Sequence, residues 1–191
     1  KVTCKLTIAP DCPVGTHRLR VRTRSGLTNL QLFSVGSLPE ISETEPNNEV
    51  ETAQAVSLGT TVNGVVESED VDYFVVDLTA GGRLAVEVEG LRLGTALFDP
   101  KIRLFGPHGH ELVTEDDTPI AAQDCAFVFA ASEDGRHIVA VSEASYGGAG
   151  NDYYRLHIGL FPRPMMVTPL GGAAGTSLEA IWLGDQVRSD R

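Results

Sequence analysis

Residues 70–89 read DVDYFVVDLTAGGRLAVEVE, and this stretch decides the fold class. A period of two puts alternate side chains on the same face of a β-strand. Ala80-Gly81-Gly82, in the middle, are turn formers. In each half, apolar residues recur at every second position: Phe74, Val76 and Leu78, then Leu84, Val86 and Val88. The stretch therefore predicts two half-buried strands joined by a tight turn.

The same pattern extends from Thr61 to Gly159. Turn signals rich in Gly, Pro and Asp separate the apolar runs, as at residues 106–109, 133–135 and 147–150. Seven or eight short strands at this spacing predict an all-β domain, an antiparallel β-sandwich of jelly-roll type. The further positions expected to face its interior are Ile102, Leu104, Phe127, Phe129, Val139, Val141, Tyr154, Leu156 and Ile158.

Both ends of the chain carry additional strand signals. Leu19, Val21 and Thr23 alternate with three arginines, which predicts a strand with one solvent face. Residues 1–36 supply only about three strands, too few for a sandwich, and are interpreted as the last strands of a separate domain. Residues 37–48 form a linker leading into the central domain, 43–159, and residues 160–191 are interpreted as the start of a further sandwich.

Composition narrows the function classes. The 191 residues carry a formal net charge of −11, which argues against nucleic acid as the partner because phosphate binding rests on Lys and Arg. No run approaches the roughly 20 apolar residues of a membrane span, so no membrane insertion is expected from this segment. Cys4 and Cys12 are close enough in sequence to form a disulfide, and three unpaired thiols with Cys125 are the alternative.

Acidic and amide side chains gather at two places. Glu43, Glu45, Asn47 and Asn48 lie on the linker, and Glu69, Asp70 and Asp72 open a strand some twenty residues later. Calcium takes six to eight oxygen ligands without strict geometry. If the linker folds onto the strand start, the two clusters come together and can share one calcium ion. The alternative is a metal-free arrangement in which these side chains only cap backbone N–H groups.

Other chemistry is poorly supported. A second acidic set, Glu115, Asp116, Asp117 and Asp124, fits either another ion or a solvated loop. The five histidines show no His-Glu-x-x-His spacing, and neither a Gly-x-Ser-x-Gly elbow nor a phosphate loop occurs. We therefore expect no catalytic residues, no organic cofactor and no enzymatic activity.

Several motifs carry a resemblance to a known family. Glu43-Thr44-Glu45-Pro46-Asn47-Asn48, then Gly64, Asp70-Val71-Asp72-Tyr73-Phe74, Gly82, Asp116-Asp117, Gly135 and Tyr154-Arg155-Leu156 resemble the bacterial pre-peptidase C-terminal domain. Those domains are secreted β-sandwiches attached to peptidases and surface proteins. They are related to clostridial collagen-binding domains, and the calcium ligands of those domains match Glu43, Glu45, Asn47, Asn48, Asp70 and Asp72 in this sequence. The resemblance therefore implies these six residues as the metal ligands. His137-Ile138 departs from the usual aromatic pair, and the resemblance does not extend to collagen binding.

The flanks resemble IPT/TIG immunoglobulin-like domains, an arrangement similar to planctomycete surface proteins. The resemblance implies an extracellular or cell-surface module that acts as a spacer or adhesion domain towards protein or polysaccharide. One alternative is a substrate-capture or maturation domain of a secreted peptidase. Another is a carbohydrate-binding module using Tyr73, Tyr146, Tyr153 and Trp182. The sequence leaves the ligand and the oligomeric state open.

Overall fold

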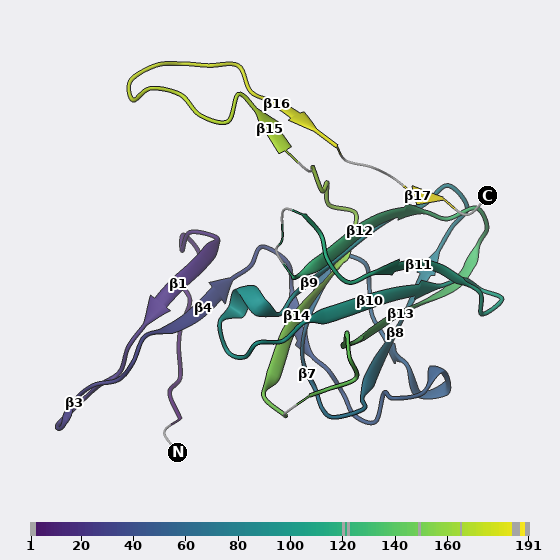
Figure 1. Ribbon diagram of the computed structural model, residues 1–191, viewed down its shortest axis with the longest axis horizontal. Helices are drawn as coiled ribbons and strands as arrows, with labels where there is room; N and C mark the ends of the chain where they lie inside the picture. The colour runs from purple at the N-terminus through teal and green to yellow at the C-terminus, as the bar shows by residue number, and fades with distance from the viewer. Residues whose placement is uncertain are drawn as a thin grey trace.

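The computed structural model describes residues 3–119, 121, 123–148, 150–164, 166–184 and 188–189. Two β-sheets pack face to face in the centre of the molecule (Figure 1). The five-stranded sheet has the order β11-β10-β13-β8-β6, with bounds Glu111–Glu115, Pro100–Phe105, Gly135–Glu143, Val71–Leu78 and Gln54–Ala55. The six-stranded sheet has the order β17-β12-β9-β14-β7-β5, with bounds Arg188–Ser189, Cys125–Ala130, Arg83–Glu89, Asp152–Gly159, Thr60–Val66 and Glu40–Ser42. The all-β sandwich predicted from the sequence is confirmed.

The two strands of the decisive stretch lie in opposite sheets. β8 pairs with β13, whereas β9 pairs with β12 and β14. The turn between them crosses from one sheet to the other, and Gly81 sits there with a φ of 76°, a conformation that favours glycine. Both strands turn their apolar sides into the space between the sheets. The hydrophobic core forms at this junction.

The core contains the positions expected from the alternation. Phe74, Leu84, Leu104 and Phe129 are fully buried, as are Val139, Leu156 and Ile158 from other strands. His137 also points inward: it is 1 % exposed, its ring centroid lies 6.1 Å from that of Phe129, and Nδ1 lies 3.1 Å from the carbonyl oxygen of Gly135. The imidazole therefore takes the place of an aromatic side chain in the core.

The sheets are mixed rather than purely antiparallel, which corrects the sequence-based prediction. β5 runs parallel to β7, β6 parallel to β8, and β17 parallel to β12, each at a sheet edge. β5 and β6 come from the segment that precedes β7 in the chain, and they lie along the outer strands in the same direction. Short edge strands of this kind cover backbone groups that would otherwise be open to pairing.

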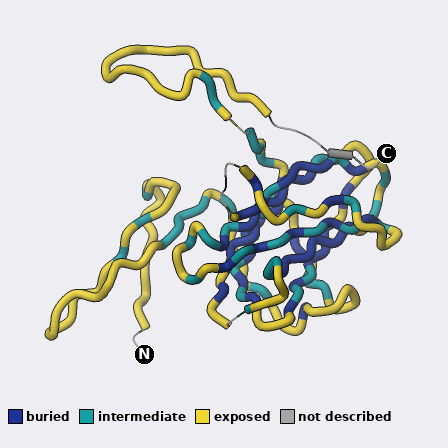
Figure 2. Tube along the Cα trace, viewed as in Figure 1, coloured by how far each residue is buried: buried dark blue, intermediate teal, exposed yellow. Residues whose placement is uncertain are grey.

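Hairpins project from the sandwich at both ends of the chain (Figures 1 and 2). β1 (Gly15–Leu19) pairs with β4 (Gln31–Val35), and β2 (Arg22–Thr23) with β3 (Gly26–Leu27). β15 (Met166–Thr168) pairs with β16 (Ile181–Leu183). Helical structure is confined, in the described ranges, to two 3-10 turns, Val50–Thr52 and Leu91–Leu93. The segment 37–48, expected as a linker, contributes β5 to the sandwich.

The three cysteines are unpaired, which is the second of the two arrangements expected from the sequence. Cys4 is exposed, Cys12 partly buried and Cys125 fully buried, and all three are free thiols. Burial raises the pKa of Cys125 well above its usual value, and its thiol donates to the carbonyl oxygen of Pro100 at 3.3 Å. Cys125 is therefore a core residue.

A core truncation tests this architecture. Phe74→Ala removes a fully buried ring at the centre of β8, so we expect a loss of about 3–5 kcal/mol of unfolding free energy. Urea denaturation monitored by circular dichroism measures it. The control is Leu97→Ala, since Leu97 is 95 % exposed and should change stability by less than about 0.5 kcal/mol. Equal effects for both variants would contradict the core assignment.

Candidate functional site

The segment Glu43–Asn48 lies against the first residues of β8 and beside β7. The backbone N–H of Tyr73 donates to the carbonyl oxygen of Asn47 at 2.9 Å, and the N–H of Glu43 donates to that of Asn63 at 3.0 Å. The Glu45–Pro46 peptide bond between these anchors is cis. Two backbone hydrogen bonds therefore fix the segment that carries four of the six predicted ligands beside β7 and the start of β8, where the other two lie.

Three carboxylates converge at this contact. Glu43, Glu45 and Asp72 each place a carboxylate oxygen within 4.8 Å of the other two. Asp72 is fully buried, Glu43 is half-buried and Glu45 is exposed. The cluster therefore has a buried floor and one side open to solvent. Within the described residues, no lysine or arginine forms an ion pair with any of the three.

The side-chain amide of Asn47 completes this group. Asn47 is fully buried, and one of its terminal atoms lies 3.0 and 3.3 Å from the two oxygens of Glu45 and 3.2 Å from Oδ1 of Asp72. With nitrogen at that position, the amide donates to both carboxylates. With oxygen there, it adds another acceptor to the cluster. In that orientation the Asn47 oxygen lies 3.0–3.3 Å from oxygens of Glu45 and Asp72, and Ca²⁺ accepts amide and carboxylate oxygens together.

Asn48 and Asp70 lie beside this centre. The Asn48 amide donates to Oδ1 of Asp70 at 2.5 Å, and Oδ2 of Asp70 accepts from the backbone N–H of Glu67 at 3.1 Å. Asn48 also accepts from the backbone N–H of Asn47 at 3.2 Å through its own Oδ1. The structure thus brings Glu43, Glu45, Asn47 and Asp72 together, while Asn48 and Asp70 support the same loop from one side.

Tyr154 was expected in the core, but its hydroxyl reaches the acidic cluster. The hydroxyl lies 2.7 Å from Oδ2 of Asp72 and 2.9 Å from Oε2 of Glu43. Oε1 of Glu43 accepts in addition from the backbone N–H of Val65 at 2.7 Å. Since one hydroxyl hydrogen serves only one acceptor at a time, the two carboxylates compete for it. The alternation of residues along β14 predicts that the ring of Tyr154 points inward. Only the tertiary structure shows which groups its hydroxyl contacts.

Gly64 provides the space for this contact. A Cβ built on Gly64 would overlap the ring and hydroxyl of Tyr154 and Oε2 of Glu43. Gly64 is part of the motif that carries the family resemblance. Its role is to let β7 approach Tyr154 and Glu43 closely.

The cluster is electrostatically strained. Burial raises the pKa of Asp72 to about 8, a shift that the Tyr154 hydrogen bond opposes and that the charges of Glu43, Asp70 and Glu45 reinforce. Burial likewise raises the pKa of Glu43, and burial together with the neighbouring carboxylates raises the pKa of Tyr154. Carboxylates in this position favour either a proton or a bound cation.

The second acidic set does not form one site. Asp124 is fully buried, and its carboxylate accepts from the backbone N–H groups of Gly90 and Leu91 at 2.9 and 2.7 Å and forms an ion pair with Arg92. Asp116 and Asp117 are exposed. Asp124 thus caps backbone N–H groups at the 3-10 turn Leu91–Leu93, and no three of Glu115, Asp116, Asp117 and Asp124 come together as one candidate metal site within the described residues.

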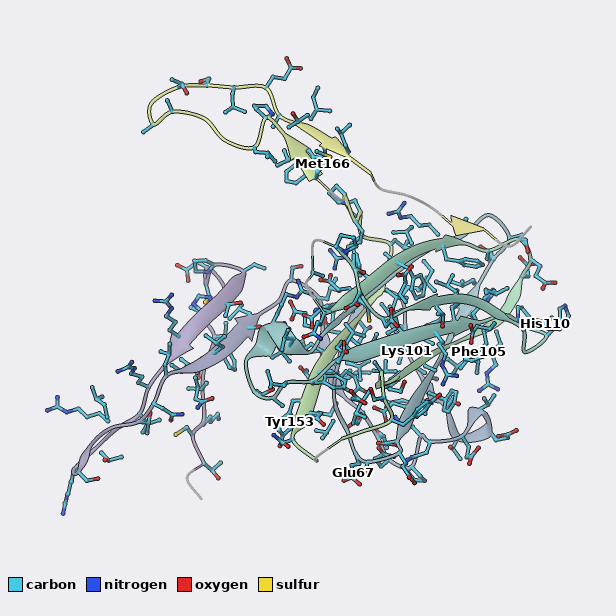
Figure 3. The ribbon with its side chains drawn as sticks, in the orientation of Figure 1. Glu67, Lys101, Phe105, His110, Tyr153 and Met166 are labelled. Carbon is cyan, nitrogen blue, oxygen red and sulfur yellow. The ribbon has the colours of Figure 1, made fainter. Side chains whose placement is uncertain are left out.

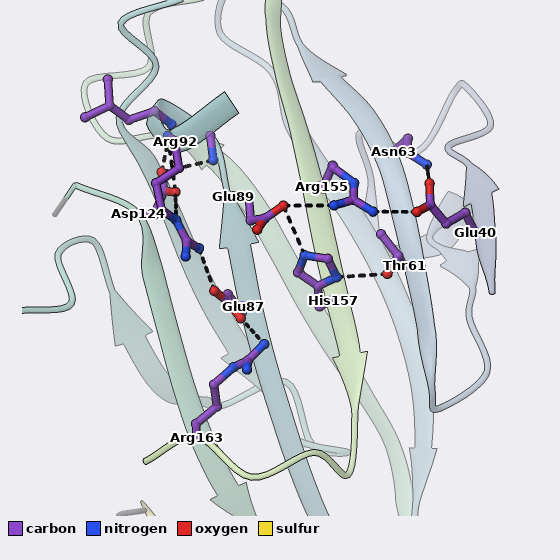
Figure 4. Close-up of polar contacts among 12 residues, drawn as sticks. Glu40, Thr61, Asn63, Glu87, Glu89, Arg92, Asp124, Arg155, His157 and Arg163 are labelled. Atoms are coloured by element: carbon purple, nitrogen blue, oxygen red, sulfur yellow. Dashed lines mark hydrogen bonds and ion pairs between the residues drawn. The ribbon is translucent and has the colours of Figure 1, made fainter. Parts of the chain in front are cut away.

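A network of ion pairs crosses the outer face of the six-stranded sheet (Figure 4). Arg155 binds Glu40 at 2.5 Å and Glu89 at 3.0 Å, so it joins β5, β14 and β9. Burial alone would raise the pKa of Glu89, but His157, Arg155 and Arg92 lower it to about 2. Glu87 bridges Arg92 and Arg163 in the same way. Acidic groups here have cationic partners, in contrast to Glu43, Glu45 and Asp72.

Comparisons with known proteins agree with the predicted resemblance. Residues 70–143 match the family described as bacterial pre-peptidase C-terminal domain, so the resemblance is confirmed over that part of the chain. Among solved structures, the chain is similar to the pre-peptidase C-terminal domain of collagenase from Bacillus anthracis. That match has 16 % identity and a TM-score of 0.44, and it covers 59 % of this chain and 99 % of that one. A search of the curated proteins found no match. In the described ranges, no helix has the length and hydrophobicity that a membrane span requires.

The close contact at Gly64 gives one test. In Gly64→Ala, the new methyl group must displace Tyr154 or Glu43, so we expect a loss of about 2 kcal/mol or more of unfolding free energy. Gly171→Ala is the matched control, because a Cβ there meets nothing within 4 Å. Thermal denaturation compares the two, and a stable Gly64→Ala protein would show that the packing around Tyr154 is loose.

The raised pKa of Asp72 gives a second test. Without metal, folding holds the Asp72 proton more tightly than the unfolded chain does, since the pKa is about 8 instead of 3.8. The chelated protein should therefore lose stability, on the order of a few kcal/mol, as pH rises from about 4 to about 8. Asp72→Asn should remove this loss and be more stable than the parent above pH 8.

The control for that experiment is Asp77→Asn, an exposed aspartate on the same strand, which should keep the parent's pH dependence. Denaturant unfolding at a series of pH values in chelator measures both variants. An Asp72→Asn profile that falls with pH as the parent's does would refute the assignment.

Proposed function

We propose that residues 40–164 form a calcium-stabilised, non-catalytic β-sandwich that acts as a spacer or adhesion module of an extracellular protein. The observation that carries the proposal is the convergence of Glu43, Glu45 and Asp72 with the Asn47 amide. Their oxygens suit a hard cation, and a divalent ion would neutralise carboxylates that have no cationic side chain beside them.

Calcium would act on the architecture rather than on a substrate. Glu43 and Glu45 belong to the segment that carries β5 into the sandwich, whereas Asp72 belongs to β8 of the opposite sheet. A shared ion would therefore tie this segment and both sheets together. A ligand that binds only the folded state stabilises it by an amount that grows with ligand concentration.

Non-catalytic function is supported by the state of the nucleophiles. The thiol of Cys125 is buried with a raised pKa, so it is not a thiolate at neutral pH. Cys12 lies 3.8 Å from Nε2 of His17, but that nitrogen is 2.8 Å from the carbonyl oxygen of Pro13 and must carry hydrogen to bond it. That ring nitrogen is then a donor, so it cannot act as a base for Cys12.

A substrate-capture or maturation role in a secreted peptidase is a second candidate. It is supported by the family match over residues 70–143, since the family is named for its position relative to peptidases. The domains that flank this segment in the parent protein distinguish the two roles. A peptidase domain beside it favours the accessory role, and a series of sandwich domains favours the spacer.

A carbohydrate platform receives less support. Tyr146, in the connection from β13 to β14, and Tyr153, on β14, are about half exposed, at 52 % and 49 %. Trp182 is 68 % exposed but belongs to the C-terminal hairpin, at the other side of the view from Tyr153 (Figure 3). Trp182 therefore does not share a surface with Tyr153.

Calcium titration tests the proposal. At a free concentration of 100 times Kd, binding should stabilise the fold by about 2.7 kcal/mol and raise Tm by roughly 5–15 °C relative to chelator. Calorimetry should show one site. The paired variant Glu45→Gln with Asp72→Asn should lose both the heat and the shift, because it removes two of the carboxylate charges.

The matched control is Glu111→Gln, which removes one exposed carboxylate at the far edge strand β11 and should bind calcium as the parent does. No heat and no shift with the parent protein would end the calcium proposal. The metal-free network, in which the Asn47 amide donates to Glu45 and Asp72, would then describe the site.

A further inference from the structure

The charges of this chain are separated along the sequence. Residues 13–39 contain four arginines and no acidic residue. Residues 25–82 contain no lysine or arginine, and ten acidic residues lie between Glu40 and Asp77. Up to residue 36, six Lys and Arg stand against one Asp, a net charge of +5, while the remainder has nine against twenty-five, a net charge of −16. The molecule therefore has a basic part and a strongly acidic part.

The structure places the basic part on the projecting N-terminal hairpin. Arg18, Arg20, Arg22 and Arg24, here called the arginine arm, are all exposed and make no ion pair within the described residues. Arg22 lies directly opposite Leu27 in the β2–β3 ladder, and Leu27 and Val21 are 64 % and 43 % exposed. The arm thus combines unpaired cations with exposed apolar side chains.

The acidic part, like the arginine arm, combines exposed charges with an exposed apolar side chain. Glu49, Glu51, Glu67 and Glu69, here called the acidic end, are all exposed. The hydrogen bond from Asn48 to Asp70 brings the two stretches that carry them side by side. Val50, between Glu49 and Glu51, is 44 % exposed. The acidic end therefore also has an apolar residue surrounded by charges, here of the opposite sign.

The arm is directed away from the acidic end of its own chain. In Figure 1 the tip at β3 lies far to the left of the sandwich, and in the same orientation Figure 3 shows Glu67 at the bottom of the sandwich. A separation seen in projection is a lower limit on the separation in space. The arginine arm is therefore free to contact the acidic end of another molecule.

We propose that the arginine arm of one copy docks onto the acidic end of a second copy. Opposite charges around an apolar centre are the arrangement of specific protein interfaces, with Leu27 and Val50 at the centre and the charges at the rim. The two surfaces differ, so the contact is head-to-tail and leaves an arm and an acidic end free for further copies. None of these eight charged residues is a proposed calcium ligand.

Charge reversal tests the contact without dependence on the calcium site. One variant carries Arg22→Glu and Arg24→Glu, and a second carries Glu49→Lys and Glu51→Lys. In chelator and about 0.01 M salt, where the Debye length is about 30 Å, the parent should associate reversibly with concentration in sedimentation velocity. Each variant alone should weaken association by at least about tenfold. The equimolar mixture should restore it, because opposite charges face each other again.

Three controls decide the outcome. Salt at about 1 M, with a Debye length of about 3 Å, should dissociate the parent. Arg136→Glu, an exposed charge on β13 outside both surfaces, should leave association unchanged. Restoration by the mixture also shows that both variants fold. A parent that stays monomeric at low salt would overturn the proposal, and so would variants that associate as the parent does. A monomer whose arginine arm binds heparin would also overturn it, because that result would indicate an anionic polysaccharide as the partner.

Discussion

The hydroxyl of Tyr154 stands between two carboxylates, and much of the sandwich depends on how that contact is satisfied. Tyr154 belongs to β14 of one sheet, Asp72 to β8 of the other, and Glu43 to the segment that enters the fold beside β7. The contact therefore joins both sheets and the edge segment at one buried point. Burial makes the arrangement costly, because a carboxylate that loses water needs a proton, a donor or a cation in exchange.

Carboxylates on the two faces of the six-stranded sheet are compensated for their loss of water in different ways. On the outer face, Glu40, Glu87 and Glu89 each meet arginine, and the pKa of Glu89 falls to about 2. At the junction with the five-stranded sheet, Asp72 and Glu43 meet other carboxylates, and their pKa values rise. On the outer face, side chains of the protein neutralise the carboxylates. At the junction between the sheets, Asp72 and Glu43 need a proton or a bound ion, which is why this cluster is the candidate site.

The uneven charge along the chain connects the site to the wider molecule. The stretch without Lys or Arg includes Glu43, Glu45 and Asp72, so the segments that carry these carboxylates supply no cationic side chain of their own. In the part of the chain that the structure describes, Glu49, Glu51, Glu67 and Glu69 of the acidic end form no ion pair, while the arginine arm stands on a separate hairpin. A single feature of composition thus bears on both the calcium proposal and the contact between copies.

The sequence by itself determined the class of fold and its interior. Alternation placed Phe74, Leu104 and Leu156 in the core because a strand exposes every second side chain to the same face. It also suggested that Glu45 and Asp72 meet, through the resemblance to a family motif. The tertiary structure alone decided that β8 and β9 separate into opposite sheets and that short edge strands run parallel. It also decided that Gly64 makes room for the Tyr154 hydroxyl at Glu43. These features depend on contacts between residues far apart in the chain, and local periodicity carries no information about which distant strands become neighbours.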